Sequence, residues 1–388
     1  MIQNSEILQV EDLCAGQLVE LKFSQTNLIS REISTQVSKN HSNLVLCPLL
    51  GDPQINGGLG YSFGQPGTDP QPWKSLATHL LKKGIGWFLP TLITDSISNL
   101  ERAFGQLESI RQEDQFLKTV CPGYHLEGPW ISPEDGYRGA HQKSFVITPK
   151  WEDFESLQSS SGGNIRLVTI APEIPGGISM IRRLVAAGVR VSLGHSQASS
   201  EQIRQAVDAG ATLSTHLGNG IAKTISRHEN PLWPQLAHPG LIPSIIPDGH
   251  HLPLDFVQTV IASKGLSKVI VTADSSPIAG LPSGIYPLWN TEVVMTPEGR
   301  VTIPGSGLLA GSGVFTDDCL RWMIDKGGMK LKSALPLCGH QAAKALDITT
   351  IDMETNKSFV LLKRNTKLSW DVKRVVFAKK VFWDNWEV

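Results

Sequence analysis

One glutamate and two histidines stand where three apolar segments of the sequence end. Glu127 closes an apolar run just before a Gly-Pro break, and His195 and His216 close two similar runs further along the chain. Each run is typical of a β-strand that carries its polar residue at the C-terminal end. Carboxylate and imidazole groups bind zinc, and three protein ligands leave a fourth position open for water. These three residues are therefore candidate ligands of a catalytic divalent cation.

Each of these residues, taken alone, also has a purely structural interpretation. A glutamate before Gly-Pro is ordinarily a solvated turn residue, and a histidine at a strand end is ordinarily a polar group with a hydrogen-bond partner. All three, however, are expected at the same end of their strands. A parallel α/β barrel places its chemistry at that end. The combination therefore favours one functional site over three unrelated polar residues.

The central part of the chain repeats a strand-then-helix pattern. Apolar runs predict eight strands, at 45–50, 86–92, 121–127, 165–171, 189–195, 211–216, 243–247 and 269–274. Helical periodicity and glycine stops predict helices at 73–83, 97–111, 178–187, 201–209, 254–264, 315–326 and 333–346. Eight such units fit a (β/α)8 TIM-type barrel, which takes ~250 residues. The expected fold class is therefore α/β.

The two ends of the chain have a different pattern from the centre. Residues 16–23 alternate apolar and polar side chains, and 358–363 and 372–381 are again rich in strand-forming residues. We expect the two ends to pair into a small β-sandwich domain made of residues 1–46 and 348–388. Residues 47–347 would then form the barrel.

Charge and composition exclude several classes of function. The chain has 388 residues, and its 35 basic and 36 acidic residues give a net charge of −1. Such a balance leaves no electrostatic footprint for nucleic acid or an anionic membrane. The five cysteines are odd in number and form no Cys-x-x-Cys pair, which argues against a disulfide framework or a cysteine metal site. With no apolar leader and no run of ~18 apolar residues, we expect a cytoplasmic protein that acts on a small molecule.

Eight short motifs lie along the predicted barrel. They are Gly-Asp-Pro-Gln-Ile-Asn-Gly-Gly at 51–58, Leu-Pro-Thr-Leu-Ile-Thr at 89–94, His-Leu-Glu-Gly-Pro-Trp at 125–130, Ala-Pro-Glu at 171–173, Gly-His-Ser at 194–196, Thr-His-Leu at 215–217, Pro-Asp-Gly-His-His at 247–251 and Ser-Pro-Ile-Ala-Gly-Leu-Pro at 276–282. Together they resemble the amidohydrolase superfamily and, within it, the N-acetylglucosamine-6-phosphate deacetylase family. The resemblance implies metal-dependent hydrolysis of N-acetyl-D-glucosamine 6-phosphate to D-glucosamine 6-phosphate and acetate, a step of amino-sugar catabolism.

The resemblance also implies one divalent cation per subunit, held by Glu127, His195 and His216. Zinc is the expected ion, with Fe²⁺, Co²⁺ and Mn²⁺ as alternatives. Many members of the superfamily hold two metals and have His-x-His after the first strand, whereas this chain has Gln54 and Asn56 there. Amides are poor zinc ligands. These two residues are expected to be hydrogen-bonding neighbours of the metal site or the remnant of a second one.

Two residues are assigned catalytic roles by the resemblance. Asp274 would take a proton from the attacking water and return it to the departing amine, and His141 would contact the substrate and polarise the acetyl carbonyl. The family has a Thr-Asp or Ser-Asp pair, whereas this chain has Thr272-Ala273-Asp274. A one-residue slip in a strand turns a side chain to the opposite face. Asp248 is therefore the alternative base.

Further residues are expected to bind the sugar phosphate. The resemblance places Asn219 and Gly220 beside it, assigns Arg227 and His251 to the phosphate itself, and puts Leu309 near the acetyl group. In the family the arginine comes from the neighbouring subunit, which implies a homodimer. The family has Asn-Ala where this chain has Asn219-Gly220, so the shape of this loop is expected to differ.

Two other functions are compatible with the same motifs. One is an amidohydrolase of this fold that acts on a different acylamino sugar or on a cyclic amide, because loops rather than the barrel set specificity. The other is a non-catalytic sugar-phosphate sensor. The intact set of metal-type residues argues against the sensor.

Overall fold

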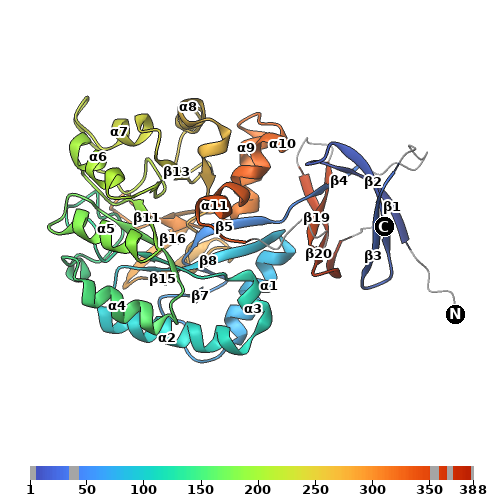
Figure 1. The fold of residues 1–388 in the computed structure, drawn as a ribbon, viewed down its shortest axis with the longest axis horizontal. Helices are drawn as coiled ribbons and strands as arrows, with labels where there is room; N and C mark the ends of the chain where they lie inside the picture. Colours follow the sequence, from blue (N-terminus) through green and yellow to red (C-terminus); the bar gives the residue numbers. More distant parts are fainter. Residues whose placement is uncertain (1–5, 35–42, 350–357, 365–369, 386–388) are drawn as a thin grey trace.

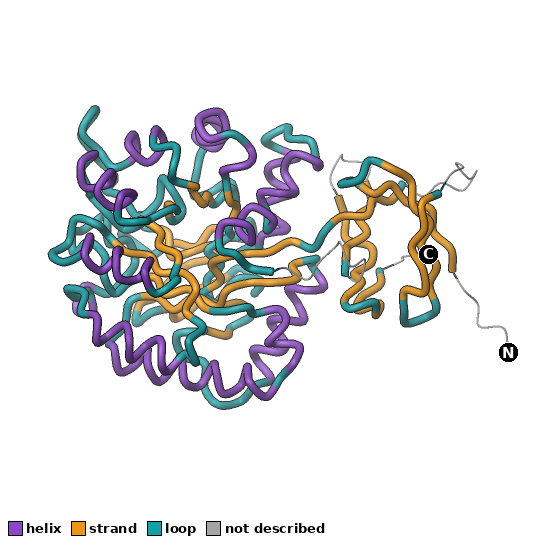
Figure 2. Tube along the Cα trace, in the orientation of Figure 1, coloured by secondary structure: helices purple, strands orange, loops and turns teal. Residues whose placement is uncertain are grey.

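The computed structural model describes residues 6–34, 43–349, 358–364 and 370–385. Helices surround a central group of strands in the larger part of the molecule, and a smaller all-β part lies beside it (Figures 1 and 2). In the smaller part the beginning and the end of the chain lie side by side (Figure 1). The fold is therefore an α/β barrel with a β-domain built from both chain ends, as predicted.

Eight parallel strands form the barrel. Their order around it is β5 (Leu50–Ile55), β8 (Ile85–Ile93), β9 (Tyr124–Glu127), β10 (Ile165–Ile170), β11 (Arg190–Leu193), β12 (Leu213–Ser214), β13 (Ile242–Ile245) and β14 (Ile270–Val271). A parallel bridge between Ile55 and Ser275 joins the last strand to the first. The strands are almost entirely buried, which explains why they are continuous apolar runs in the sequence.

The prediction for the first barrel strand is wrong. The segment β4 (Leu44–Cys47) belongs to the sheet of the small domain, and the barrel starts only at Leu50. Both segments are buried, so one apolar run crosses from one domain to the other without a break in the pattern. The other seven predicted strands each overlap an observed strand.

Most predicted helices are present. They are α1 (Gln71–Lys82), α2 (Ile97–Glu113), α5 (Gly177–Ala186), α6 (Ser200–Asp208), α8 (Leu254–Lys264) and α9 (Thr316–Asp325). The helix predicted at 333–346 is instead divided into α10 (Leu331–Ala334), the 3-10 turn η3 (Leu335–Leu337) and α11 (His340–Ala345). Pro336 and Gly339 interrupt it, and a side chain at Gly339 would lie 2.4 Å from the backbone nitrogen of Gly51.

Several elements were not predicted. They are the helices α3 (Gln115–Val120), α4 (Trp151–Ser160) and α7 (Leu232–Ala237), the turns η1 (Lys143–Phe145) and η2 (Leu266–Lys268), and the short strands β6 (Gly57–Gly58) and β7 (Tyr61–Ser62).

Among the described residues, no helix is long and apolar enough to cross a membrane.

An unpredicted antiparallel sheet is inserted between β14 and α9. It consists of β15 (Gly284–Leu288), β16 (Thr291–Met295), β17 (Arg300–Thr302) and β18 (Leu309–Ser312). A parallel bridge between Ser275 and Ser312 attaches this sheet to the end of the barrel. The insert therefore stands next to the C-terminal ends of the barrel strands.

The small domain is one seven-stranded sheet. Its order is β21 (Lys380–Asp384), β20 (Trp370–Phe377), β19 (Phe359–Arg364), β4, β1 (Glu6–Asp12), β2 (Gln17–Phe23) and β3 (Leu28–Ile33). The edges of the sheet meet, because the Leu28 amide donates to the Lys379 carbonyl at 2.7 Å. The closed sheet surrounds an apolar core that includes Phe23 and Phe359. The division of the chain at residues 46 and 348 stays a prediction.

Candidate active site

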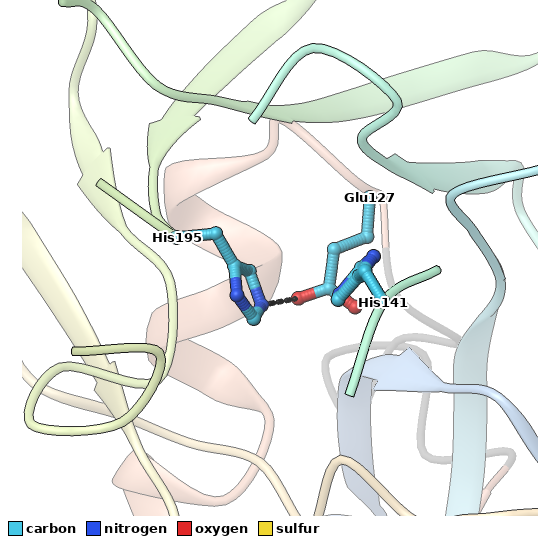
Figure 3. Close-up of side chains that lie close together, drawn as sticks. All are labelled: Glu127, His141 and His195. Atoms are coloured by element: carbon cyan, nitrogen blue, oxygen red, sulfur yellow. Dashed lines mark ion pairs between the residues drawn. The ribbon is translucent and has the colours of Figure 1, made fainter. Parts of the chain in front are cut away.

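The three predicted metal ligands converge at the C-terminal ends of β9, β11 and β12. Glu127 Oε1 lies 3.0 Å from His216 Nε2 and 3.3 Å from His195 Nε2, and all three side chains are buried. Figure 3 shows Glu127 and His195 facing each other from different elements. The structure therefore brings one carboxylate and two imidazoles to a single point.

A third imidazole, that of His141, lies beside this group. His141 follows β9 in a loop, and its ring centre is 4.3 Å from that of His195 (Figure 3). One donor atom each of Glu127, His141 and His195 lies within 4.8 Å of the others. His141 Nδ1 is 2.7 Å from Thr94 Oγ1, which fixes the orientation of the ring. The second ring nitrogen of His141 is left for a metal or a substrate.

Three site residues have an unusual backbone conformation. The φ angles of His195, His216 and Asp274 are 50°, 29° and 44°, in the left-handed region that side-chain-bearing residues rarely adopt. Neighbouring elements hold these turns: the Ser132 amide donates to the His195 carbonyl, and the Ser312 amide donates to that of Asp274. Such strain is typical of functional positions that the surrounding structure over-determines.

The two amides of the first strand connect the glutamate to the candidate base. Gln54 Nε2 donates to Glu127 Oε1 at 3.0 Å and to Asp274 Oδ1 at 2.9 Å, and Asn56 Nδ2 donates to the same Asp274 oxygen at 2.7 Å. These amide nitrogens act as donors to carboxylates. Gln54 and Asn56 are thus hydrogen-bonding neighbours of the site in this structure.

The extra residue before Asp274 does not turn its side chain away from the site. Strand β14 ends at Val271, so Asp274 lies in the turn beyond the strand, where the alternation of strand faces no longer applies. The buried carboxylate of Asp52 holds this turn, because it accepts hydrogen bonds from Thr272 Oγ1 and from the Ala273 amide. Asp274 therefore faces Gln54 and Asn56.

Asp248, the alternative base, is occupied by other partners. It accepts hydrogen bonds from the His250 and His251 amides, from Ser312 Oγ at 2.8 Å and from His251 Nδ1 at 2.7 Å. The last of these bonds orients the His251 ring. The geometry thus favours Asp274 over Asp248 as the base, and Asp248 as the residue that positions His251.

Burial and neighbouring charges shift the pKa values of the site. Burial, followed by the charge of Glu127, raises the pKa of Asp274 to about 6. Burial, followed by the proximity of His195, lowers the pKa of His141 to about 3, so this ring is neutral near pH 7. Burial also raises the pKa of Glu127, but His195 and His216 outweigh this effect and hold it well below its usual range. Glu127 is therefore an anion.

A cavity of about 400 Å³ opens over these groups. The predicted substrate residues that line it are His141, Asn219, Gly220, His251 and Leu309. Arg227 is exposed and is not one of the described residues that line the cavity. The structure therefore assembles most of the predicted substrate residues in one chain, and Arg227 lies outside their cavity.

Gly220 is required by its close approach to His195. Its φ is +60°, and a Cβ at this position would lie 2.8 Å from His195 Nδ1. That nitrogen donates to the Tyr137 carbonyl at 3.0 Å. Gly220 stands where the family has alanine, and the loop that carries it packs directly against His195, a candidate metal ligand.

Lys223 and Trp289 are the cavity residues missing from the prediction whose side chains could bind a sugar phosphate. Lys223 is the one lysine or arginine among the described residues that line it, and Trp289 reaches it from the turn between β15 and β16. Lys223 follows Asn219 by four positions. A search for basic residues close to the expected phosphate-binding loop could therefore have identified Lys223. No sequence pattern marks Trp289, because its sheet was not predicted.

The donor groups fit a divalent cation. His195 Nδ1 donates to a backbone carbonyl, and its Nε2 is buried and has no hydrogen-bond partner among the described residues. This nitrogen faces the anionic Glu127 at 3.3 Å. A histidine whose second nitrogen is fixed by a carbonyl is a common metal ligand. Glu127, His195 and His216 could thus hold the ion, with His141 beside it.

Comparison with known proteins gives a consistent result. No family model matches the chain. The N-acetylglucosamine-6-phosphate deacetylase of Bos taurus is 32% identical over 333 residues, which cover 82% of this chain and 79% of that protein. The N-acetylgalactosamine-6-phosphate deacetylase of Escherichia coli O157:H7 is 30% identical over 317 residues, 81% of each chain.

Solved structures share the whole fold. The N-acetyl-D-glucosamine-6-phosphate deacetylase of Mycobacterium smegmatis superposes with a TM-score of 0.82 at 24% identity, covering 97% of this chain and 99% of that one. The enzyme of Thermotoga maritima gives 0.81 at 23% identity, with the same coverage. The chain belongs to the N-acetylglucosamine-6-phosphate deacetylase family of hydrolases and has the amidohydrolase fold.

Proposed function

We propose that this protein hydrolyses N-acetyl-D-glucosamine 6-phosphate to D-glucosamine 6-phosphate and acetate. The observation that carries the proposal is the position of Gln54, whose one amide nitrogen contacts both Glu127 and Asp274. These two hydrogen bonds hold Asp274, the candidate base, next to Glu127, a candidate metal ligand. Hydrolysis of an amide needs both groups at one carbonyl, whereas a binding protein would need neither.

The proposal includes one divalent ion per subunit, held by Glu127, His195 and His216. Zinc fits best, because one carboxylate and two imidazoles are typical of catalytic zinc sites. When bound, the ion supplies Lewis-acid chemistry: it polarises an amide carbonyl and makes water more acidic. Gln54 and Asn56 support a count of one, since their amide nitrogens donate to carboxylates. About one activity-linked ion per chain is expected from metal analysis, and two would contradict this set of ligands.

The chain's own residues account for the proton transfers. Asp274 accepts a proton from the attacking water and returns it to the amine nitrogen when the C–N bond breaks. A base works best when its pKa lies near the working pH, and burial next to Glu127 brings that of Asp274 close to this range. His141, held by Thr94, is neutral and can donate a hydrogen bond to the carbonyl oxygen.

The phosphate is proposed to bind to His251, which Asp248 orients, together with Asn219 and the backbone of Gly220. All three residues line the catalytic cavity. Lys223 adds a positive charge from the same chain. Arg227 of a second subunit would complete the site in a homodimer, because this residue is exposed and lies outside its own cavity. Molar mass in solution tests the dimer.

An acetate-release assay on the purified, zinc-loaded protein tests the proposed function. N-acetylglucosamine 6-phosphate should be turned over, and N-acetylglucosamine without phosphate should be a much poorer substrate. Equal kcat/KM values for the two sugars would show that the enzyme does not recognise the phosphate. Binding of the phosphorylated sugar without acetate release would instead favour a sensor.

The C4 epimer of the sugar is the second candidate substrate. It is favoured by the Escherichia coli relative, an N-acetylgalactosamine-6-phosphate deacetylase that is 30% identical. The same assay with N-acetylgalactosamine 6-phosphate decides between the two sugars, and a higher kcat/KM for the galactose form would reassign the substrate.

A further inference from the structure

A second cavity of about 430 Å³ lies next to the catalytic one. Four residues line both cavities: Asn56, Ile93, Ala140 and Trp289. The second cavity continues past them to Ser62, at the end of β7, and to Gln65 just after it. Its volume is in the range of sites that bind small molecules. None of the proposed steps of acetate release uses this space.

The position of the second cavity relates it to the reacting carbonyl. Asn56, on the shared wall, donates to Asp274, so this wall lies next to the candidate base. The cavity extends along the ends of β5 and β8, whereas the proposed phosphate residues Lys223 and His251 follow β12 and β13. In an N-acylated sugar phosphate, the sugar and the phosphate leave the amide on one side and the acyl chain leaves it on the other. The second cavity is therefore on the acyl side.

We propose that the second cavity is an acyl subsite, which lets the enzyme hydrolyse amino-sugar 6-phosphates whose N-acyl groups are longer than acetyl. Water adds to the carbonyl carbon, the C–N bond breaks, its proton goes to the amine, and a carboxylate longer than acetate leaves. The inference rests on the proposed deacetylase function and extends its substrate class. A closed acetyl pocket would reject each added methylene by ~10-fold or more.

The experiment compares three substrates: glucosamine 6-phosphate carrying N-acetyl, N-propanoyl or N-butanoyl groups. We expect kcat/KM for the butanoyl compound to equal the acetyl value or to exceed it by up to about 16-fold, since each of its two added methylenes contributes binding worth about fourfold when it is buried. A butanoyl value more than about 100-fold below the acetyl value, the loss expected of a closed pocket at ~10-fold per methylene, would overturn the subsite. Loss of activity on all three compounds, acetyl included, would reject the deacetylase function itself.

A variant that fills the second cavity sharpens the test. Ser62→Phe should lower kcat/KM for the butanoyl compound by at least ~10-fold, as a blocked methylene site does, and leave that for the acetyl compound unchanged. Ser62→Ala should preserve both, and Ser263→Phe, the same change on the exposed side of α8, is the surface control. If Ser62→Phe does not fold, Gln65→Trp fills the cavity from its exposed rim. Equal losses for acetyl and butanoyl compounds in the filled variant would refute the acyl subsite.

Discussion

The floor and the sides of the catalytic cavity are built differently. On the floor, Glu127, His195 and His216 are at least nine-tenths buried and contact one another. Asp274 completes the floor, and Gln54 donates hydrogen bonds both to it and to Glu127. On the phosphate side, Lys223 is exposed and belongs to a loop. The floor residues stand at the ends of barrel strands or in the turns directly after them, whereas Lys223 stands further along the loop after β12.

This contrast indicates how the protein separates reaction from selectivity. Groups that must stay close to a reacting carbonyl are placed at the ends of rigid strands, and a group such as Lys223, proposed to recognise the rest of the substrate, is placed on a loop. Substitutions on the floor should therefore change kcat, and substitutions on the phosphate side should change KM. The kinetic predictions below test that separation, from the largest expected effect to the smallest, and a prediction about the stability contributed by Asp248 follows them.

Asp274→Asn should lower kcat by at least ~10²-fold, the lower end for a positioned acid–base group. Metal content should stay at the wild-type level, because Asp274 is not one of the proposed ligands. Metal analysis and steady-state kinetics on the same preparation measure both quantities.

Glu127→Gln provides the contrast for this prediction. It removes the anionic ligand, so metal content and activity should fall together. Two results together would assign the role of base to Asp248 instead. The Asp274→Asn enzyme would keep more than a tenth of wild-type kcat, and the Asp248→Asn enzyme would be inactive although it still binds the metal.

Lys223→Met should lower kcat/KM for the phosphorylated substrate by about tenfold, mainly through KM, because a charge-assisted hydrogen bond is worth ~1.5 kcal/mol or more. The unphosphorylated sugar should lose nothing. Lys223→Arg should restore most of the activity, and Lys344→Met, at an exposed site on α11, is the matched control. If Lys223→Met lowered kcat and left KM unchanged, the proposed division of roles between the floor and the phosphate side of the cavity would be wrong.

Asp248→Asn should cost about 2 kcal/mol of unfolding free energy near neutral pH, as expected for a lost hydrogen-bonded charge. Burial raises the pKa of Asp248, but its bond with His251 outweighs burial and holds the pKa below the ordinary value of 3.8. The stability from this bond is therefore present above 3.8 and is lost as the pH falls below it. Denaturant titrations at neutral pH and below 3.8 should show the gap between wild type and variant narrowing with acid. A constant gap would contradict the charge-based role.

The sequence predicted the barrel well because its strands are buried on both faces and alternate with amphipathic helices. The domain crossing at Leu44–Leu50 was missed because both sides of it are equally apolar. The insert β15–β18 was missed because each of its strands has at most two buried residues and a loosely alternating pattern.

The candidate site was predictable in its residue types but not in its contacts. Glu127, His195 and His216 could be selected because each closes an apolar run. Nothing in the sequence indicated that Asp52 would hold the turn before Asp274, or that Gln54 would contact two carboxylates. Such bonds join residues more than seventy positions apart, and only the closure of the barrel brings them together.

The small domain imposes an order on the making of this protein. Strand β19 lies between β4 and β20, so the N-terminal strands cannot complete their sheet until residue 359 and those after it have been synthesised. The barrel residues leave the ribosome before that partner exists. During synthesis β1 to β4 must therefore wait with an open, apolar edge at β4, and this nascent stage is the one at which the chain most needs protection from aggregation.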